Sequence, residues 1–96
     1  MSLVSEINKN NENKDKIKIR LIFFGPLKDY FQSEKDLNLE SNTDIKTIMN
    51  SLIKENKLSE ALLRSSRAAI SDEFVDLARI VSDGDEIYFL PPASGG

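Results

Sequence analysis

The sequence predicts an α+β domain in which one sheet packs against one main helix. Apolar side chains recur at every second position in the segments 17–24, 36–40 and 86–90, which is typical of strands with a buried face. Residues 45–53 instead have apolar side chains at i, i+3, i+4, i+7 and i+8, the spacing of an amphipathic helix. This order of elements favours a single roll of sheet and helix.

The composition restricts the classes of partner. The chain has 96 residues, enough for one domain, and 13 Lys and Arg against 16 Asp and Glu give a net charge of -3. This balance disfavours nucleic acid or an anionic membrane as the main partner, because both bind basic surfaces. We find no run of 18 apolar residues and no signal-peptide segment, so we expect a cytoplasmic protein with no membrane partner.

Two residue types are missing altogether. The chain has no Cys and no His, which excludes disulfides, Cys/His zinc sites and His-dependent nucleophilic catalysis. We therefore expect no metal site. These absences favour a binding module, a carrier or a subunit completed by a partner over an autonomous enzyme.

The folded domain is expected to span residues 17–96. Residues 1–16 are predicted to be a disordered extension, because no apolar side chain occurs between Asn8 and Lys16. In the first strand, 17–24, the odd positions are all apolar and form the predicted core face, whereas the even positions begin polar and end with Ile22 and Phe24. A Gly–Pro pair ends this strand, and a short helix over 27–31 is expected to bury Leu27, Tyr30 and Phe31.

The second half of the chain continues the pattern. Residues 41–44 supply capping oxygens for the main helix, and 58–63 is predicted to be a short helix with Leu58, Leu62 and Leu63 on one side. Segments 67–71 and 74–77 are predicted to form a hairpin with Asp72–Glu73 at the turn. A turn at 82–85 leads into the last strand, 86–90.

The last six residues are a candidate for chemistry. They are Pro91, Pro92, Ala93, Ser94, Gly95 and Gly96. Residues without large side chains can thread a narrow channel, and the Gly96 carboxylate can be activated as an acyl-adenylate. The proline pair would stiffen the base of this tail. The alternative is a flexible end without function.

The chain resembles a known family of sulfur carriers. Residues 83–96 read DGDEIYFLPPASGG and closely resemble the C-terminus of the small subunit of molybdopterin synthase, which belongs to the MoaD/ThiS ubiquitin-like family. The segments IKIRLIFFGPLKD at 17–29 and AAI at 68–70 resemble it as well. The family often has Asn after the latter strand, where this chain has Ser71, so the hairpin is expected to bend differently.

The resemblance implies a β-grasp fold and a non-catalytic sulfur-donor subunit. An activating enzyme would use ATP to adenylate Gly96, which is then converted to a thiocarboxylate. The tail of residues 91–96 would enter the large synthase subunit, which holds the catalytic residues, and would donate sulfur for the dithiolene of molybdopterin. The resemblance also implies a heterotetramer and no bound cofactor. Alternatives are a carrier for thiazole or another product, a ubiquitin-like modifier, or a plain interaction module.

The partner surface follows from strand parity. Ile87 and Phe89 share the core face of the last strand, so Leu90 points outward, as does Phe24 in the first strand. With Phe74 they would form an apolar patch beside the tail, and these positions also match apolar contact positions of the resembling family. The alternative places one or two of the three in the core.

Other charged candidates are weaker. Asp83, Asp85 and Glu86 cluster at a turn, which favours a solvated turn over a metal site, although an activating enzyme could recognise their charge. Arg64 and Arg67 flank two serines and could contact an anion, but we favour a plain surface role for both.

Overall fold

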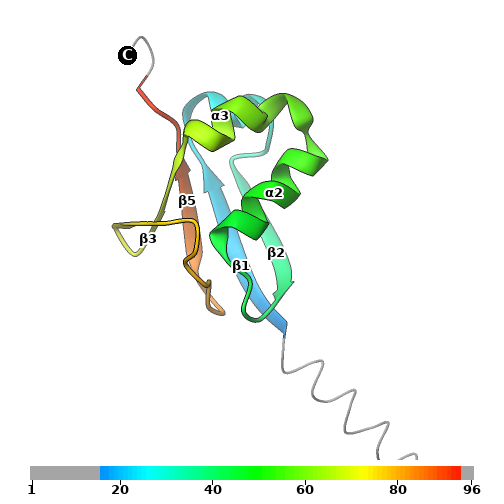
Figure 1. Ribbon diagram of the computed structural model, residues 1–96, viewed down its shortest axis with the longest axis vertical. Coiled ribbons are helices and arrows are strands. Elements are labelled where there is room, and N and C mark those ends of the chain that lie inside the picture. Colours follow the sequence, from blue (N-terminus) through cyan, green and yellow to red (C-terminus); the bar gives the residue numbers. More distant parts are fainter. Residues whose placement is uncertain (1–15, 94–96) are drawn as a thin grey trace, which may run out of the picture.

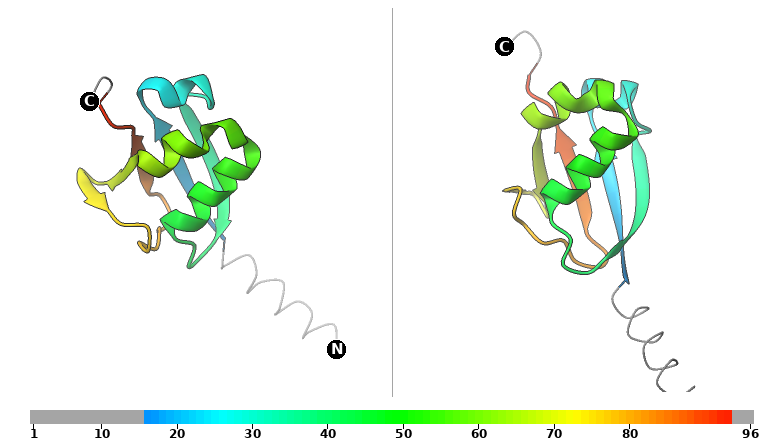
Figure 2. Two further views of the ribbon diagram at one scale, coloured as in Figure 1. Left: turned by 45° about the horizontal axis from the view of Figure 1, so that its top comes forward. Right: turned by 45° about the vertical axis from the view of Figure 1, so that its right-hand side comes forward.

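The computed structural model describes residues 16–93, which form a five-stranded mixed sheet with its helices on one face (Figures 1 and 2). The predictions for residues 1–15 and 94–96 lie outside the described residues. No helix in the described range is long and apolar enough to cross a membrane. The elements in chain order are β1 (Lys16–Phe23), the 3-10 helix η1 (Gly25–Asp29), β2 (Glu34–Glu40), α2 (Ile45–Glu55), the 3-10 helix η2 (Lys57–Ser59), α3 (Glu60–Ser65), β3 (Arg67–Ile70), β4 (Glu73–Val75) and β5 (Glu86–Leu90).

The strand order is β2-β1-β5-β3-β4, which confirms the predicted α+β roll. The first and last strands lie side by side in the centre and run parallel, with Leu21 opposite Ile87 and Phe23 opposite Phe89. All other neighbouring strands are antiparallel. The last strand is therefore paired on both sides, and it ends beside the end of β1 (Figure 1).

The core lies between the sheet and α2. Leu21, Ile87 and Phe89 are fully buried, and all five predicted stripe residues of α2 are buried as well. The Phe23 ring stacks on Phe89 with centroids 5.8 Å apart and on Phe31 at 4.8 Å. The odd-numbered residues of β1 thus pack against the apolar stripe of α2, as the period of two in the strand and the helical spacing in 45–53 predicted.

A short helix forms after β1 as predicted, but η1 is a 3-10 helix that begins and ends two residues earlier than the predicted segment 27–31, because the Gly–Pro pair is its start and not only the end of the strand. Pro26 lies in its first turn, where the fixed backbone angle of proline suits a helix start. Leu27 and Phe31 are buried as predicted, and Tyr30 is half-buried against the core. The second strand is longer than predicted, because β2 begins at Glu34, and β1 begins one residue early, at Lys16.

Asp44 caps the main helix, as the segment 41–44 predicted. Its carboxylate accepts a hydrogen bond from the backbone N–H of Thr47 at 2.8 Å, and hydrogen bonding with Thr47 lowers the pKa of Asp44. The loop after β4 also contacts this helix end, because the Arg79 carbonyl accepts from the N–H of Ile45 at 3.0 Å. Backbone donors that a helix leaves unpaired at its start are satisfied here.

The prediction for Leu58 is wrong. We expected it to pack with Leu62 and Leu63, but Leu58 is 82% exposed, whereas Leu63 is fully buried. The segment splits into η2 and α3, and the tighter 3-10 turn breaks the helical spacing between Leu58 and the later leucines. Ser59 is buried instead, with its hydroxyl donating to the Asn56 carbonyl at 2.6 Å.

The hairpin forms, but its turn lies one residue earlier than predicted. Ile70 pairs with Glu73, so the turn residues are Ser71 and Asp72, not Asp72–Glu73. Both have positive φ, 53° and 67°, as a type I′ turn requires. The second arm also ends early, because β4 stops at Val75 and the predicted continuation to residue 77 is an exposed loop.

We expect Ser71→Asn to stabilise the domain by roughly 0.5 kcal/mol, because Asn tolerates left-handed backbone better than Ser does. Urea unfolding measures the difference. Ser71→Ala is the control and is expected to give no gain, because alanine has no side-chain group to satisfy the local backbone. Equal stabilisation by both variants would contradict the backbone explanation.

Candidate functional site: an apolar patch beside the root of the tail

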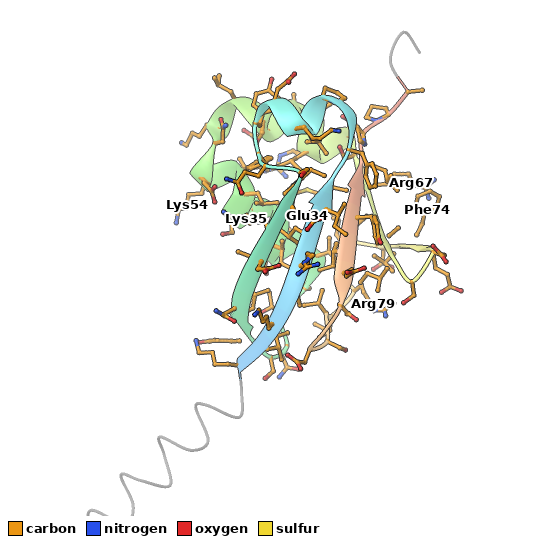
Figure 3. All side chains as sticks on the ribbon, turned by 180° about the vertical axis from the view of Figure 1, so that it is seen from behind. Glu34, Lys35, Lys54, Arg67, Phe74 and Arg79 are labelled. Carbon is orange, nitrogen blue, oxygen red and sulfur yellow. The ribbon has the colours of Figure 1, made fainter. Side chains whose placement is uncertain are left out.

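The helices cover one face of the sheet, and the other face presents side chains outward (Figures 2 and 3). One register row crosses all five strands on this outer face. Its members in strand order are Glu34, Ile22, Tyr88, Ala69 and Phe74. The row carries one charge, at the β2 edge, and is otherwise apolar or aromatic. We call this side of the sheet the outer face.

The three residues of the predicted patch lie together on the outer face. Phe24 is 39% exposed and Phe74 56% exposed, while Leu90 is half-buried. They share a shallow hollow of about 320 Å³, whose lining residues are Phe24, Ala69, Asp72, Phe74, Tyr88 and Leu90. None of the three belongs to the buried core cluster, so the alternative that places one or two of them in the core is wrong.

Tyr88 is a further patch residue, beyond the three predicted ones. Its ring stacks on Phe24 with centroids 5.8 Å apart and an interplanar angle of 17°. Its hydroxyl donates to Glu86 at 3.3 Å, and the negative charge of Glu86 raises the pKa of Tyr88. Strand parity places Tyr88 on the same face as Leu90, two residues later, so the signal is present in the sequence. Tyr88 therefore joins the aromatic part of the outer face to its acidic part.

The acidic part surrounds one arginine. Arg20 Nε lies 2.9 Å from Asp36 Oδ1, and Arg20 Nη1 lies 3.9 Å from Glu34 Oε1 and 4.0 Å from Glu86 Oε2. The hydrogen bond with Asp36 is the main reason that the pKa of Arg20 is raised. Three carboxylates around one guanidinium leave this cluster with a net negative charge. We call these four residues the acidic cluster.

Arg67 also lies on the outer face, next to Phe74 (Figure 3). Its guanidinium carbon is 3.7 Å from the centroid of the Phe74 ring, well within the range of a cation–π contact. In the register Arg67 lies opposite Leu90, the last residue of β5. From the sequence we expect a plain surface role for Arg67, because residue spacing does not reveal a contact between side chains of neighbouring strands.

The tail begins directly after this patch. β5 ends at Leu90, as the proline pair predicted, and Pro91 is half-buried while Pro92 and Ala93 are exposed. Gly25 has φ +57°, and a Cβ there would lie 3.3 Å from Pro91 Cγ, so glycine leaves room for the proline. The proposed functional residues Ser94, Gly95 and Gly96 lie outside the described residues.

In the acidic turn before β5, two carboxylates accept hydrogen bonds from backbone N–H groups. Asp83 Oδ1 accepts from the N–H of Lys18 at 2.7 Å, and Asp85 Oδ2 accepts from the N–H of Ser82 at 2.8 Å. Within residues 16–93 no group of three metal-ligating side chains is placed to hold an ion. Arg64 is likewise occupied, because its Nε lies 2.8 Å from Glu60. The turn and Arg64 therefore have structural partners.

The sheet order and the single main helix define a ubiquitin-like protein of the β-grasp fold. Its patch adjoins a C-terminal segment that leaves the central strand of the sheet. The protein-family model described as the ThiS family matches residues 21–96. The chain belongs to the ThiS family.

Comparisons with individual proteins agree with this assignment. The molybdopterin synthase sulfur carrier subunit of Mycobacterium tuberculosis is 21% identical over 82 residues, which cover 83% of this chain and 99% of that protein. A solved complex of subunits 1 and 2 of the molybdopterin-converting factor from Helicobacter pylori contains a chain that is 30% identical, with a TM-score of 0.57; the match covers 83% of this chain and all of that one.

The fold is also shared with a protein modifier. SAMP1, the small archaeal modifier protein 1 of Haloferax volcanii, has a TM-score of 0.71 at 16% identity, with 82% of this chain and 99% of that chain covered. At this identity the likeness concerns the fold alone.

Proposed function

We propose that the chain is the sulfur-carrier subunit of a molybdopterin synthase and that Gly96 carries the sulfur. The observation that carries the proposal is the position of β5: this paired central strand leads into the proline pair beside the apolar patch. The family and the Helicobacter pylori complex support the same function. A rigid root and a tail of small residues suit delivery of a terminal group to another protein.

The proposed chemistry takes place at the carboxylate of Gly96. A carboxylate oxygen attacks the α-phosphorus of ATP on an activating enzyme, pyrophosphate leaves, and an acyl-adenylate forms. A sulfur nucleophile equivalent to hydrosulfide then attacks the acyl carbon, and AMP leaves as the thiocarboxylate forms. On the large subunit the thiocarboxylate sulfur attacks a carbon of the dithiolene precursor, and the carbon–oxygen bond at that carbon breaks, which leaves a thioester between Gly96 and the product. Water then attacks the acyl carbon of this thioester, so that the sulfur stays on the product and Gly96 is released as a carboxylate. Each chain delivers one sulfur, so a dithiolene requires two deliveries. In this scheme the partner enzymes supply the acids and bases.

The large subunit is the proposed partner of the patch. Phe24, Phe74 and Leu90 provide apolar contact area, and Tyr88 adds an aromatic ring with a polar end. Aromatic residues in the centre of an interface often carry most of the binding energy. Docking at this patch would bring the root of the tail to the partner surface, so that Pro91–Gly96 can enter its active site.

The mass of the C-terminus tests the proposal. When the chain is produced together with its activating enzyme and a sulfur source, we expect the intact mass to rise by the difference between sulfur and oxygen. Fragmentation should place that change on Gly96. The matched control is the same production without the activating enzyme, which should give the unmodified carboxylate. Unmodified carboxylate in both preparations would contradict the proposal.

The main alternative is a ubiquitin-like protein modifier, which fits the fold shared with SAMP1. An adenylated Gly96 attacked by a lysine amine would give an isopeptide. Lysine conjugates and no association with the large subunit would favour this alternative, whereas association with a thiazole-forming enzyme would favour a carrier for that product. A plain interaction module would bind its partner equally well without the tail.

A further inference from the structure

We propose that Arg67 determines the orientation of docking by binding a carboxylate of the partner, next to the root of the tail. This inference rests on the proposed function, because it concerns the same docking face. Arg67 is exposed and lies opposite Leu90 in the register, at the end of the outer face from which the tail leaves. A group bound to Arg67 would therefore lie beside the entrance through which the tail passes into the partner.

The guanidinium is held in place before a partner arrives. Its contact with the Phe74 ring, 3.7 Å from carbon to centroid, restricts a side chain that otherwise has several rotatable bonds. Stacking occupies the face of the guanidinium and leaves the N–H groups at its edge available as donors. A preorganised side chain loses less conformational entropy on binding, which favours its use as an anchor.

Two other arginines of the structure form ion pairs, and Arg67 does not form one within the described residues. Arg20 is paired with Asp36, and Arg64 is paired with Glu60. Within residues 16–93, Arg67 has no carboxylate within 4.0 Å, and its guanidinium contacts the Phe74 ring instead. The nearest acidic residue of the patch is Asp72, which lines the same hollow as Phe74 without forming an ion pair with Arg67. An unpaired, oriented guanidinium on an aromatic patch is suited to a bidentate contact with a carboxylate from another chain.

The acidic cluster and Arg67 carry charges of opposite sign at different positions along the strands of the outer face. Arg67 precedes Ala69 on β3, and Ala69 lies in the row of Tyr88, while the cluster residue Glu86 lies one row further from the tail. Along the strands, Arg67 therefore lies in the row nearest the tail. Glu34 lies one row away, and the other three cluster residues, Arg20, Asp36 and Glu86, lie two rows away, roughly 13 Å at about 6.7 Å per row. A partner carboxylate is attracted at one end and repelled at the other. The same acidic cluster disfavours a polyanion such as a nucleic acid as the occupant.

The inferred occupant is thus a protein surface with an apolar centre and an Asp or Glu facing Arg67. Charge complementarity of this kind fixes the register of two surfaces more than it adds affinity. Only one orientation places the partner's carboxylate on Arg67 and keeps it away from the acidic cluster. In that orientation the root of the tail, which follows Leu90, lies beside the contact between Arg67 and the partner.

Titration calorimetry of the full chain with its large subunit tests the inference. We expect Arg67→Glu to weaken binding by on the order of 10- to 100-fold, and Arg67→Gln to weaken it less. An Asp or Glu of the large subunit changed to Lys should then restore binding to Arg67→Glu. Far-UV circular dichroism and urea unfolding confirm that both variants are folded, as an exposed site predicts.

Arg79→Glu is the matched control, because it makes the same change of charge on the loop that contacts the start of α2. It should bind like the unmodified chain. Equal weakening by Arg79→Glu and Arg67→Glu would indicate a general charge effect and overturn the inference, as would binding of Arg67→Glu within twofold of the unmodified chain. Failure of the unmodified chain to bind the large subunit would instead contradict the proposed function.

Discussion

Removal of Gly96 is expected to abolish sulfur transfer while leaving the free energy of unfolding unchanged. The tail is anchored at Leu90 and Pro91, so its reach is fixed by the number of residues beyond that point. One residue fewer withdraws the terminal carbon by up to roughly 3.5 Å. A misplacement of about 1 Å can cost on the order of 100-fold in rate, so we expect no measurable product above background.

Product formation by the reconstituted synthase, with chain activated in advance, measures this effect. Adding one alanine after Gly96 should be equally damaging, because the carboxylate then lies too far along the tail. The matched control is Gly96→Ala, which keeps the length and adds only a Cβ, and which should retain more activity than either length variant. Normal activity of the shortened chain would contradict the proposed role of Gly96.

The second large effect is expected in the core. Phe89→Ala should lower the free energy of unfolding by about 3–5 kcal/mol, because it removes a fully buried ring that stacks on Phe23 and leaves a cavity. Small domains are stabilised by only about 5–15 kcal/mol in total. The variant should therefore lose a large share of its stability, and its thermal midpoint should fall by more than about 12 °C.

Urea unfolding followed by circular dichroism measures this loss. Phe74→Ala provides the matched control, because it is the same chemical change at a ring that is 56% exposed. We expect Phe74→Ala to lower the free energy of unfolding by less than about 1 kcal/mol, mainly through loss of the contact with Arg67. Similar losses for the two variants would show that Phe74 contributes to the core.

The sequence predicted the parts of the fold that depend on periodicity. The alternation in β1 and β5 and the stripe of α2 identified the buried faces, because burial requires one continuous apolar face from each element. The same parity identified Phe24, Phe74 and Leu90 as outward residues, and the structure brings them together. Periodicity cannot give the order of the strands in the sheet; that arrangement came from the resemblance.

The misplaced features depend on local backbone geometry or on contacts between distant segments. Leu58 is exposed because a 3-10 turn interrupts the helical spacing, and no residue in that segment signals the change. The hairpin turn was misplaced because Ser71 and Asp72 adopt positive φ without glycine. The stacking of Arg67 on Phe74 depends on the pairing of β3 with β4, which the residue types alone do not determine.

The central position of β5 also has a mechanical consequence. The tail is attached to a strand that pairs through four residues with β1 on one side and four with β3 on the other. Tension applied to the tail acts along this strand, and ladder hydrogen bonds lie across that direction. The load is therefore shared by both ladders in shear, instead of opening one bond at a time. An enzyme that draws the tail into its channel can pull on the chain without peeling the strand from the sheet.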